Sequence, residues 1–537
     1  MARPSSTVET RGNVRVWRSI QPTPVPTTSH KVEHRVVIVG TGPVGLALAI
    51  DLGQRGHEVL VLGKFDFIPD GSKAICFSKR SLDILDRLKV GEQAVERGVT
   101  WNVGKVFWKD SREPIYQFDL LPVKNQKMPG FINLQQYYLE DLLIGRISQL
   151  PNVEVGWGHE VTEVSTSASG AKLGVKAEGG DYVIESEWVV ACDGSKSTIR
   201  NKLGLDFEGR VFEDNFLIAD VRMKGDFPAE RWFWFDPPFN PGKSVLLHKQ
   251  PDDIWRIDFQ LGWDIDREAC IRAENVNPLV KAMLGDDVEF EREWYSVYTF
   301  QCRRMARFVH GRAIFAGDSA HLVSPFGARG CNGGLADIDN LGWKLDLVLR
   351  GDAPEELLET YNHEAITTAD ENILNSTRST DFLTPKSTVS TAFRDAVLDL
   401  AGVSGFARAF VNSGRLSTAV SYPDGPLNSP DEGDWSGGVA SGSPLIDAPL
   451  DEGWLLEKLG GRFVVLSNGG QFTPLTGVDH IDLAKRAKAQ IAIERLDLRP
   501  GSAYLIRPDQ YVAARFRTPN ADTLTAALNR SSRGVSA

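Results

Sequence analysis

The sequence predicts a multidomain α/β protein with an antiparallel sheet inserted into it. A glycine-rich motif at residues 40–45 stands between a strand-like apolar run and a helix-like segment. Residues 205–298 alternate polar and apolar and are rich in aromatic side chains, as in an antiparallel sheet with one covered face. Residues 421–450 are dense in Pro, Gly, Ser and Asp and precede a small α/β segment. With 537 residues, the chain is too long for one core.

Composition and charge restrict the function classes. Hydrophobic residues make up 42% of the chain and charged residues 24%, as in an ordinary globular protein. The net charge is -11 with no long basic run, which argues against a nucleic-acid partner. No apolar stretch approaches the roughly 20 residues that a membrane-crossing helix needs. The five cysteines include no Cys-x-x-Cys pair, so we expect free thiols in a reducing compartment, the cytoplasm, and no metal site.

Residues 1–34 precede any regular pattern. They contain scattered arginines and closely spaced prolines but no apolar segment. Such a composition argues against a secretory signal and favours a flexible extension, with an organelle-targeting segment as the alternative.

The segment that follows has the order strand, glycine motif, helix, strand. Residues 36–39 are an all-apolar run of strand length, and residues 46–55 have helical periodicity. In the Gly-x-Gly-x-x-Gly motif between them, the first glycine makes a tight turn, the second lets the backbone approach a pyrophosphate, and the third lets the helix pack on the strand. Free N–H groups at the helix start would bind the phosphates. The residues expected to contact a dinucleotide here are Gly40, Gly42, Pro43, Val44 and Gly45.

The second strand of this unit departs from the usual pattern at its end. An Asp or Glu there would accept hydrogen bonds from the adenosine ribose, but this chain has Gly63 followed by Lys64. The ribose would then be held by water, by backbone or by a neighbour such as Asp66. Gly63 either only weakens cofactor binding or makes room for a 2′-phosphate. We predict that Glu at this position tightens binding by about 1–3 kcal/mol.

Two further strand-loop motifs point to a flavin nucleotide. Residues 189–200 begin with an apolar strand that leads to Asp193. Residues 311–321 begin with another such strand, which leads to Asp318, and a glycine-rich loop at 324–334 then opens a helix. Asp318 can accept a ribityl hydroxyl, and the loop can bring backbone N–H groups to the pyrimidine edge of a flavin. The helix start would stabilise negative charge on the reduced ring.

Together, the three motifs resemble those of the group A FAD-dependent aromatic hydroxylases, the para-hydroxybenzoate hydroxylase superfamily. The resemblance covers residues 35–370 and is greatest with the branch of 3-(3-hydroxyphenyl)propionate hydroxylase and phenol hydroxylase. It implies an FAD enzyme of aromatic catabolism that uses NADH or NADPH and O2 to hydroxylate a phenolic ring through a flavin C4a-hydroperoxide. It further implies a cytoplasmic homodimer.

The resemblance also implies the domain arrangement. A Rossmann-type FAD-binding domain would consist of residues 35–204 and 299–420, with the antiparallel substrate sheet at 205–298 inserted between them. A linker at 421–450 and a thioredoxin-like domain at 451–537 would complete the chain. Because that domain has no Cys-x-x-Cys here, we expect it to serve packing or dimer contacts rather than dithiol chemistry.

Single residues receive cofactor contacts from the same resemblance. The loop that contains Lys73 looks like the one that brings a basic side chain to the FAD pyrophosphate, although the family usually has Arg there. Gln136 looks like the residue that contacts the ribityl chain. Ser319, Cys331 and Gly333 depart from the family pattern close to the flavin. The other expected contacts are Gly63, Lys64, Ser72, Ala74, Arg80, Val161, Asp193, Asp318, Pro325, Ala328, Gly330, Cys331 and Asn332.

Catalysis in this family needs a group that takes the proton of the phenol. On two adjacent strands of the predicted substrate sheet, the chain has His248-x-Gln250 and Arg256-x-Asp258-x-Gln260. We predict that His248 accepts the proton, directly or through Asp258, with Arg256 as a third catalytic residue. Packing in the sheet is the alternative for His248. Where para-hydroxybenzoate hydroxylase has a carboxylate-binding Arg, this chain has Gln250, so its substrate would differ from a simple benzoate.

Other residues and functions are left open. Tyr295 and Tyr298 are further candidates for the base, whereas His321 after the Gly-Asp motif is interpreted as structural. In the aromatic run at 232–235, strand alternation allows at most half of the side chains to face the substrate. A polyketide or antibiotic is the alternative substrate class. A flavin-binding protein without catalysis is the alternative of another class.

Overall fold

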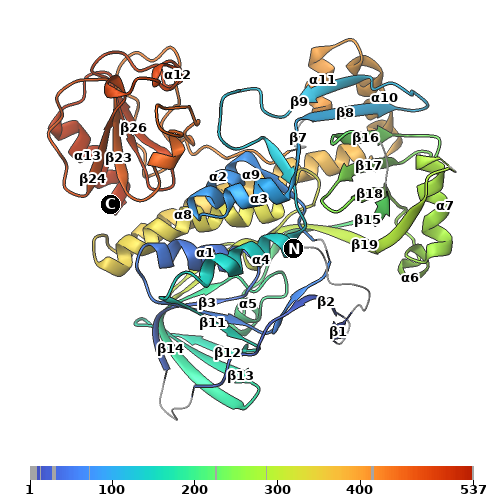
Figure 1. Cartoon of the computed structure of the whole chain (residues 1–537), viewed down its shortest axis with the longest axis horizontal. Coiled ribbons are helices and arrows are strands. Elements are labelled where there is room, and N and C mark those ends of the chain that lie inside the picture. Colours follow the sequence, from blue (N-terminus) through green and yellow to red (C-terminus); the bar gives the residue numbers. More distant parts are fainter. Residues whose placement is uncertain are drawn as a thin grey trace.

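A computed structural model of the chain has three parts, which Figure 1 shows side by side. A mixed sheet with long helices over it lies at the bottom and centre, a second large sheet lies on the right, and the C-terminal sheet lies at the upper left. The α/β class predicted from the sequence is confirmed. The structure describes residues 9–11, 14–26, 32–71, 73–223, 227–285, 287–412 and 416–534.

The mixed sheet carries the three predicted motif strands next to one another. Its order is β11 (Val153–Trp157), β4 (Val59–Gly63), β3 (Val32–Val39), β14 (Gly180–Ala191), β13 (Ala171–Ala177) and β12 (Glu160–Thr166), with β21 (Ala313–Phe315) and β20 (Val309–His310) added beyond β14. Strand β14 runs parallel to both β3 and β21, so that Val189 lies opposite Val37 and Ala313. Because parallel strands end at the same edge of a sheet, the loops after these three strands meet there.

Two long helices, α1 (Pro43–Gln54) and α8 (Gly330–Arg350), pack closely over this sheet. Their approach depends on glycine. A Cβ on Gly334 would lie 2.5 Å from Val44 Cγ2, and one on Gly342 would lie 2.0 Å from Asp51 Oδ2. The two helices therefore begin side by side, near the loops where the motifs meet. The other helices of this part are α2 (Lys79–Arg87), α3 (Gly91–Arg97), α4 (Gln136–Ile147), α5 (Thr198–Lys202), α9 (Leu357–Leu383) and the 3-10 turn η1 (Gly317–Ser319).

The second large sheet is bigger than the predicted insertion at 205–298. Its order is β22 (His321–Leu322), β19 (Phe290–Arg304), β15 (Glu208–Met223), β18 (Ile254–Gln260), β17 (Ser244–Lys249), β16 (Arg231–Phe235), β8 (Val103–Trp108) and β9 (Tyr116–Asp119). Strands β8 and β9 come from the predicted cofactor domain, and β8 pairs in parallel with β16. The predicted boundary is wrong here because pairing between strands so far apart in the chain leaves no local signal.

The two faces of this sheet are covered by different helices. Phe233 and Phe235 belong to the core under α10 and α11, whereas Trp232 and Trp234 pack with the core under α7. We call the first the inner face and the second the outer face. The predicted alternation of the aromatic strand is therefore confirmed. The helices over the sheet are α6 (Arg267–Cys270), α7 (Ala273–Leu284), α10 (Thr388–Ala401) and α11 (Gly405–Asn412).

A small sheet joins the two large ones. It consists of β6 (Cys76–Ser78), β10 (Phe131–Asn133) and β7 (Val99–Trp101), all antiparallel. The Asn133 side-chain amide donates a hydrogen bond to the backbone carbonyl of Lys249, 2.7 Å away on β17. The small sheet is thereby anchored to β17 of the second large sheet.

The N-terminal extension differs from the flexible segment predicted at 1–34. Part of it forms β1 (Thr10–Arg11) and β2 (Val14–Ser19), and β2 pairs with β5 (Phe67–Pro69). Trp17 stacks on Tyr137 with ring centroids 5.1 Å apart, and the Arg15 guanidinium lies 3.1 Å from the Asp70 carboxylate. These contacts explain why residues 14–19 are held, since Trp17 packs against Tyr137 of α4 and Arg15 pairs with Asp70.

The C-terminal part has its own four-stranded sheet. The order is β24 (Val478–Asp482), β23 (Phe463–Ser467), β25 (Ala503–Ile506) and β26 (Val512–Phe516). Strands β23 and β24 are parallel, and the other pairs are antiparallel. The segment between β23 and β24 forms no helix, and the thioredoxin-like assignment stays a prediction. The helices here are α12 (Gln490–Arg495), α13 (Ala521–Arg533), η2 (Leu456–Lys458) and η3 (Leu483–Lys485).

The predicted linker at 421–450 is packed rather than free. Leu427 and Ala448 are fully buried in the cores of the C-terminal part, and Pro444 forms a bridge with Tyr511. Residues 421–450 therefore form an irregular but ordered segment that packs on the cores of the C-terminal part. The sequence signal was composition alone, and burial was not visible in it.

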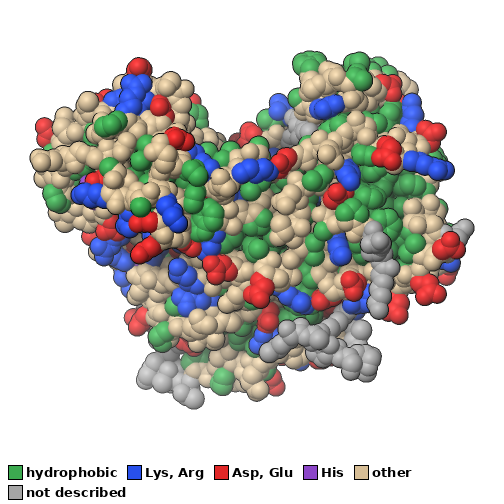
Figure 2. All heavy atoms as spheres, turned by 45° about the horizontal axis from the view of Figure 1, so that its top comes forward, with side chains coloured by type: hydrophobic (Ala, Val, Ile, Leu, Met, Phe, Trp, Pro, Cys, Tyr) green, Lys and Arg blue, Asp and Glu red, His purple; other side chains and the backbone are tan. Residues whose placement is uncertain are grey.

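Figure 2 shows a hollow between the C-terminal part and the substrate sheet. Within the described part of the chain, no helix combines the length and the apolar character that crossing a membrane requires. The same described residues contain no group of three His, Cys, Asp or Glu side chains placed to hold a metal ion.

Candidate FAD and substrate site

The first glycine motif has the shape that a bound pyrophosphate needs. Gly40 has φ +121°, and a Cβ there would lie 2.2 Å from the carbonyl oxygen of Cys192. A Cβ on Gly45 would lie 2.1 Å from the Gly40 carbonyl, whereas one on Gly42 would meet nothing within 4 Å. The first and third glycines thus serve close packing, and the second leaves an open surface. Gly42 precedes α1 without a side-chain cap, so the N–H groups of its first turn are available for a phosphate.

Pro43 and Val44 have structural roles in addition to the predicted cofactor contact. Pro43 opens α1, where a missing N–H costs nothing. The Val44 side chain packs against both other helical elements of the site, since a Cβ on Gly317 would lie 3.1 Å from it and one on Gly334 2.5 Å. Val44 therefore positions the Gly-Asp turn, and its contact with the cofactor stays a prediction.

The end of β4 corrects the expectation for Gly63. A Cβ at this position would lie 2.4 Å from Thr41 Cγ2 and 2.6 Å from Thr41 Oγ1. Thr41 thus occupies the space in which an acidic side chain would begin, and Glu at position 63 cannot fit unless Thr41 changes. Asp66, the proposed substitute, is paired with Arg11 of the N-terminal extension at 2.5 Å. The Lys64 ammonium lies over the Phe65 ring, 4.9 Å from its centroid.

The second motif is a capped turn in which one carboxylate oxygen of Asp193 has no hydrogen-bond partner. Ser197 Oγ accepts from the backbone N–H of Arg200 at 3.0 Å and so caps α5. Arg200 in turn donates to the carbonyl oxygen of Ser319 at 2.9 Å, which ties the second motif to the third. Asp193 accepts from the N–H of Ile199 through Oδ2, while its buried Oδ1 has no partner. Burial raises the pKa of Asp193. An unpartnered buried acceptor fits a ligand that carries hydroxyl or amide donors.

The third motif is held from behind by a buried pair. Asp337 Oδ2 accepts from the N–H of Gly317 at 2.8 Å and lies 2.6 Å from His321 Nε2. Burial lowers the pKa of His321, but Asp337 outweighs this effect and the net shift is upward. His321 is thus structural, as interpreted from the sequence. Asp318 is left exposed on the other side of the turn, where a ribityl hydroxyl can reach it.

The loop before α8 makes a tight turn with two residues in the left-handed region of backbone conformation. Gly327 and Ala328 have φ +100° and +55°, and the N–H of Ala328 donates to the carbonyl of Pro325 at 2.9 Å. Gly330 begins α8 without a side-chain cap, so the helix start can serve a flavin edge as predicted. Cys331 follows it and is partly exposed.

Asn332 acts as a clamp. Its side-chain oxygen accepts from the N–H of Ser78, and its amide donates to the carbonyl of Cys76, each at 3.0 Å. The residue predicted to contact the cofactor therefore fastens α8 to β6. The nearby departures from the family pattern have local reasons too. Ser319 Oγ lies 2.6 Å from the Ala191 carbonyl, and a Cβ on Gly333 would already be tight against Asn372 and His321.

The loop with Lys73 lies against α4. Gln136 accepts from the N–H of Ala74 at 3.1 Å and donates to Glu140 at 2.8 Å. Burial raises the pKa of Glu140 to about 7, and the charge of Lys73 opposes that shift. Lys73 therefore lies close enough to Glu140 for its charge to act there, and its contact with the pyrophosphate stays a prediction. Ser72 lies outside the described residues.

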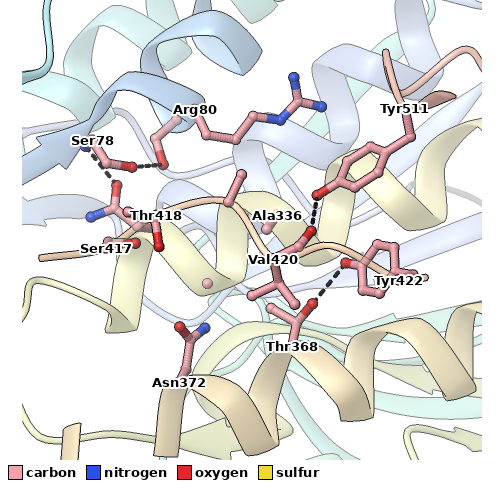
Figure 3. A pocket seen from close by; sticks show the side chains of 14 residues that line it. Ser78, Arg80, Ala336, Thr368, Asn372, Ser417, Thr418, Val420, Tyr422 and Tyr511 are labelled. Atoms are coloured by element: carbon pink, nitrogen blue, oxygen red, sulfur yellow. Dashed lines mark hydrogen bonds between the residues drawn. The ribbon is translucent and has the colours of Figure 1, made fainter. Parts of the chain in front are cut away.

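Arg80 corrects another prediction. Its guanidinium donates to Asp339 at 2.6 Å and to Gln510 at 2.9 Å, and it lies over the ring of Tyr511. Figure 3 shows it reaching past Ser78 toward Tyr511, along a small polar pocket between α2, α8, α9 and residues 417–422. Arg80 does not contact the cofactor, because α2 has already begun at Lys79 and turns its side chain toward the C-terminal part.

Val161 has a buried side chain at a register irregularity in β12. Only its backbone is free to meet an adenine, and that contact stays a prediction. The described structure therefore offers most of the predicted FAD contacts through backbone and glycine rather than through side chains.

The predicted substrate residues come together on the inner face of the second sheet. His248 Nε2 lies 3.1 Å from Asp258 Oδ2, and His248 is buried. Arg256 donates to both carboxylate oxygens of Asp220 at 2.8 Å, and Gln250 donates to the same carboxylate at 3.3 Å. Arg256 thus neutralises a buried carboxylate, and its catalytic role stays a prediction.

The protonation of His248 follows from its surroundings. Burial and the nearby Arg231 lower the pKa of His248 to about 4, so the ring is neutral at neutral pH. Burial would raise the pKa of Asp258, but His248 and Arg256 outweigh it and the net shift is downward. The ionised Asp258 therefore accepts the N–H at Nε2, which leaves the lone pair on Nδ1. That Nδ1 has no hydrogen-bond partner.

The sequence analysis missed Arg231 and Cys76. Arg231 is buried and donates to the Cys76 thiol at 3.4 Å. Its position at the start of the alternating aromatic strand, two residues before Phe233, was the available signal. Of the two alternative bases, Tyr295 bonds Asn277 on the outer face and Tyr298 is 44% exposed. Neither lies beside His248.

The fold and these contacts define the class of protein. The family model described as FAD binding domain matches residues 33–376, and the chain belongs to this family. The match includes all three motifs and the first two sheets. FAD is the cofactor, and the glycine turns, the open Asp193 oxygen and the exposed Asp318 fit it.

Known relatives narrow the class. The chain is similar to 6-methylpretetramide 4-monooxygenase of Streptomyces rimosus, with 30% identity over 92% of this chain and 93% of the relative. It is also similar to 3-(3-hydroxy-phenyl)propionate/3-hydroxycinnamic acid hydroxylase of Escherichia coli O8 (strain IAI1), with 30% identity over 63% of this chain and 60% of the relative. The chain therefore spans less than two thirds of that second relative. The resemblance found from the sequence motifs is confirmed.

A solved structure shows the same fold over almost the whole chain. The flavin-dependent monooxygenase PieE, in complex with FAD and substrate, has a TM-score of 0.75 over 93% of this chain and 97% of that one. The sequence identity is 20%, so the similarity establishes the fold alone.

Proposed function

We propose that this chain is an FAD-dependent monooxygenase that uses NADH or NADPH and O2 to hydroxylate a phenolic aromatic ring. The observation that carries the phenolic part is the His248–Asp258 pair, whose imidazole is neutral and has an unpartnered acceptor at Nδ1. Bound FAD, once reduced, supplies the electrophilic oxygen from O2. A phenol reacts faster with such an oxygen when its own proton is removed, which is the task of His248.

The inner face supports this chemistry in two ways. Phe233, Phe235 and Leu246 form an apolar wall, which keeps water from the reacting ring. Asn133 and Cys76 connect the wall to Asn332 at the start of α8, so the phenol-binding face and the cofactor loop share one hydrogen-bond chain. The chain ends at the backbone of Lys249, next to His248, which supports a substrate position close to the cofactor loop.

The substrate class has two candidates. One relative is named for hydroxyphenylpropionate and hydroxycinnamic acid, as in aromatic catabolism, and the other for a polyketide, 6-methylpretetramide. The polyketide relative matches along nearly its whole length, which supports a multi-ring phenol as the second candidate. A flavin-binding protein without catalysis is disfavoured by the relatives, which are named as a monooxygenase and a hydroxylase.

The test begins with the cofactor. The purified protein is expected to be yellow, and acid precipitation should release FAD, because the site holds it without a covalent bond. NADH and NADPH oxidation and O2 uptake are then measured across monocyclic and polycyclic phenols, and product mass is determined. A gain of one oxygen atom supports the proposal. A colourless protein that FAD cannot reconstitute, or a flavoprotein that hydroxylates no phenol, contradicts it.

The cytoplasmic location and the homodimer belong to the same proposal. All five cysteines are free thiols, which suits a reducing compartment. Four apolar side chains around α10 and α11 are exposed by 54–87% and offer a surface for a second copy; they are Val389, Phe393, Val403 and Phe406. Sedimentation should show a dimer that Phe406→Glu disrupts and that Val183→Glu, on β14, leaves intact. A monomeric parent protein contradicts the dimer.

A further inference from the structure

Arg231 is a buried cation that forms no ion pair with a carboxylate among the residues that the structure describes, although it lies close enough to Asp258 to lower the pKa of that carboxyl. It is 4% exposed, its Nη1 donates to the Cys76 thiol, and its Nε has no hydrogen-bond partner. The rings of Trp101 and Phe233 lie 5.6 and 5.3 Å from its guanidinium carbon. A guanidinium stays charged at any physiological pH, and burying it unpaired is costly. Such an arrangement points to a ligand that brings electron density to it.

Arg231 faces His248 directly. The two residues are Cα partners across β16 and β17, so their side chains share the inner face. Side chains opposed in this way have Cβ atoms about 4.5–5.5 Å apart. His248 Nδ1 and Asp258 Oδ1 are also buried without partners. Arg231, His248 and Asp258 thus each have one buried polar atom without a hydrogen-bond partner, and the three residues are neighbours.

The two partners select the ligand. The Nδ1 lone pair needs a hydrogen-bond donor, whereas the Arg231 N–H groups need an acceptor. A carboxylate would suit Arg231 but would repel the Nδ1 lone pair. A hydroxyl group suits both, because its hydrogen can point to His248 while its oxygen accepts from Arg231. The site therefore favours a phenolic oxygen over a carboxylate.

The charges around the site can accommodate a phenolate anion if His248 takes up the phenol proton. Arg256 and Asp258 face the site from β18, Asp220 from β15 and the Cys76 thiol from β6. The two arginines and the two aspartates balance. If the phenol proton moves to His248, the new imidazolium balances the new phenolate, so the step needs no net charge in the buried site.

We propose that Arg231 is a further catalytic residue, whose guanidinium binds the substrate's phenolic oxygen and stabilises the phenolate that forms when His248 takes the proton. The inference rests on the proposed function. In this step the O–H bond breaks, an Nδ1–H bond forms and the electron pair stays on oxygen, so no oxidant or reductant takes part. Arg231 makes the transfer favourable because it lies where the charge develops.

The experiment uses the FAD-loaded enzyme and 4-nitrophenol, whose phenolate has its own absorption band. Difference spectra across pH measure the fraction of bound probe that is phenolate. Arg231→Gln should raise the apparent pKa of the bound phenol by about 1–3 pH units, the usual effect of removing an opposite charge at this range. Arg231→Lys should give a smaller rise, because an ammonium supplies the charge without the planar fork.

Arg222→Gln is the matched control. Arg222 lies on β15 of the same sheet and is paired with Glu293 at 3.1 Å, away from His248. It should leave the titration of the bound probe as in the parent enzyme. If Arg231→Gln does not retain FAD, the titration of Arg231→Lys decides alone. The inference is overturned if the apparent pKa of the bound phenol in Arg231→Lys and in Arg222→Gln equals that in the parent enzyme.

The outcomes separate this inference from the proposed function. If phenols bind and Arg231→Gln leaves the phenolate fraction unchanged, Arg231 is not catalytic while the monooxygenase proposal stands. If neither 4-nitrophenol nor the other phenols bind to the FAD-loaded enzyme, the phenolic function fails and the role of Arg231 fails with it.

Discussion

Two clusters of buried charge in this protein differ in how completely their polar atoms are paired. One joins α8 and α9 to the C-terminal part and contains Lys344, Glu364, Arg507 and Asp509, all at most 1% exposed on their side chains. The other is the inner-face cluster around His248. Both are held in cores, and both mix cations with carboxylates.

In the interface cluster the charged groups satisfy one another. Arg507 donates to both oxygens of Glu364 at 2.7 and 2.9 Å, and Lys344 donates to Glu364 at 2.7 Å. Asp509 accepts from Arg507 at both oxygens, at 3.0 and 2.5 Å, and from the Trp343 indole at 3.0 Å. A network of this kind holds two parts of a protein in one arrangement.

In the inner-face cluster the pairing is incomplete. His248 Nδ1, Asp258 Oδ1 and Arg231 Nε are all buried without partners. Native proteins rarely leave such groups unpaired, and three of them on one face suit a site that a ligand completes. The structural His321–Asp337 pair also leaves one atom open on each residue, so the role of the inner face has to be tested by substitution. The predictions below test this distinction.

The largest effect is expected for His248→Ala. FAD content and NAD(P)H oxidation should persist, because the residue lies in no cofactor motif. Hydroxylation should fall by about 10²–10⁴-fold in the step that the base serves, with hydrogen peroxide making up the lost product. Product and peroxide per NAD(P)H are the measurement. Asp258→Asn should show a weaker form of the same change.

The control for this variant is His310→Ala, which removes a histidine on β20 of the mixed sheet that bonds a backbone carbonyl and lies outside the second large sheet. It should stay coupled. Raising the pH should partly rescue His248→Ala, because solvent then supplies the phenolate. If His248→Ala stays fully coupled at neutral pH, His248 is a packing residue and the contrast between the two clusters does not mark function.

The interface cluster should show the opposite behaviour. Glu364→Gln removes the shared anion and leaves Arg507 and Lys344 with less compensation, which should lower the free energy of unfolding by about 3–5 kcal/mol. Denaturant unfolding measures it, and coupling of product to NAD(P)H in the folded fraction should be unchanged. Glu359→Gln, on an exposed pair with Arg307, should cost at most about 1 kcal/mol. Equal losses in both variants would contradict a structural role for the cluster.

Low pH should destabilise the protein through protonation of Glu364. Burial would raise the pKa of Glu364, but Arg507 and Lys344 outweigh it and hold the pKa well below the ordinary value of 4.5. A carboxyl whose folded pKa is depressed adds stability above its unfolded pKa and loses it as the pH falls further. The parent should therefore lose stability below about pH 4.5 more steeply than Glu364→Gln. Parallel unfolding curves for the two proteins would argue against this pair.

The smallest effect concerns the ribose end of the cofactor site, where Gly63 has no side chain to accept a hydrogen bond from the ribose. Gly63→Glu alone should weaken FAD binding, because its Cβ meets Thr41. Combined with Thr41→Ala, it should bind FAD more tightly than Thr41→Ala alone by about 1–3 kcal/mol, since the ribose gains a charged acceptor. Titration of the apoprotein with FAD measures both. No gain in the double variant would mean that the ribose hydroxyls are already satisfied.

The sequence by itself determined the cofactor class and much of its site. The spacing of Gly40, Gly42 and Gly45 is a local pattern, and each motif is a strand, a turn and a helix within a few residues. Short-range patterns of this kind are legible because neighbours in the chain are neighbours in space. The pairing of His248 with Asp258 was also predictable, since strand alternation puts both on one face.

Only the tertiary structure decided what lies opposite these residues. Arg80 turned out to serve the C-terminal part, Thr41 to fill the space beside Gly63, and Arg231 to face His248. Each depends on contacts between segments whose spacing in the chain carries no periodic signal. Whether a buried polar atom has a partner is a property of the folded environment, because desolvation and pairing are set by all the segments that meet at a point.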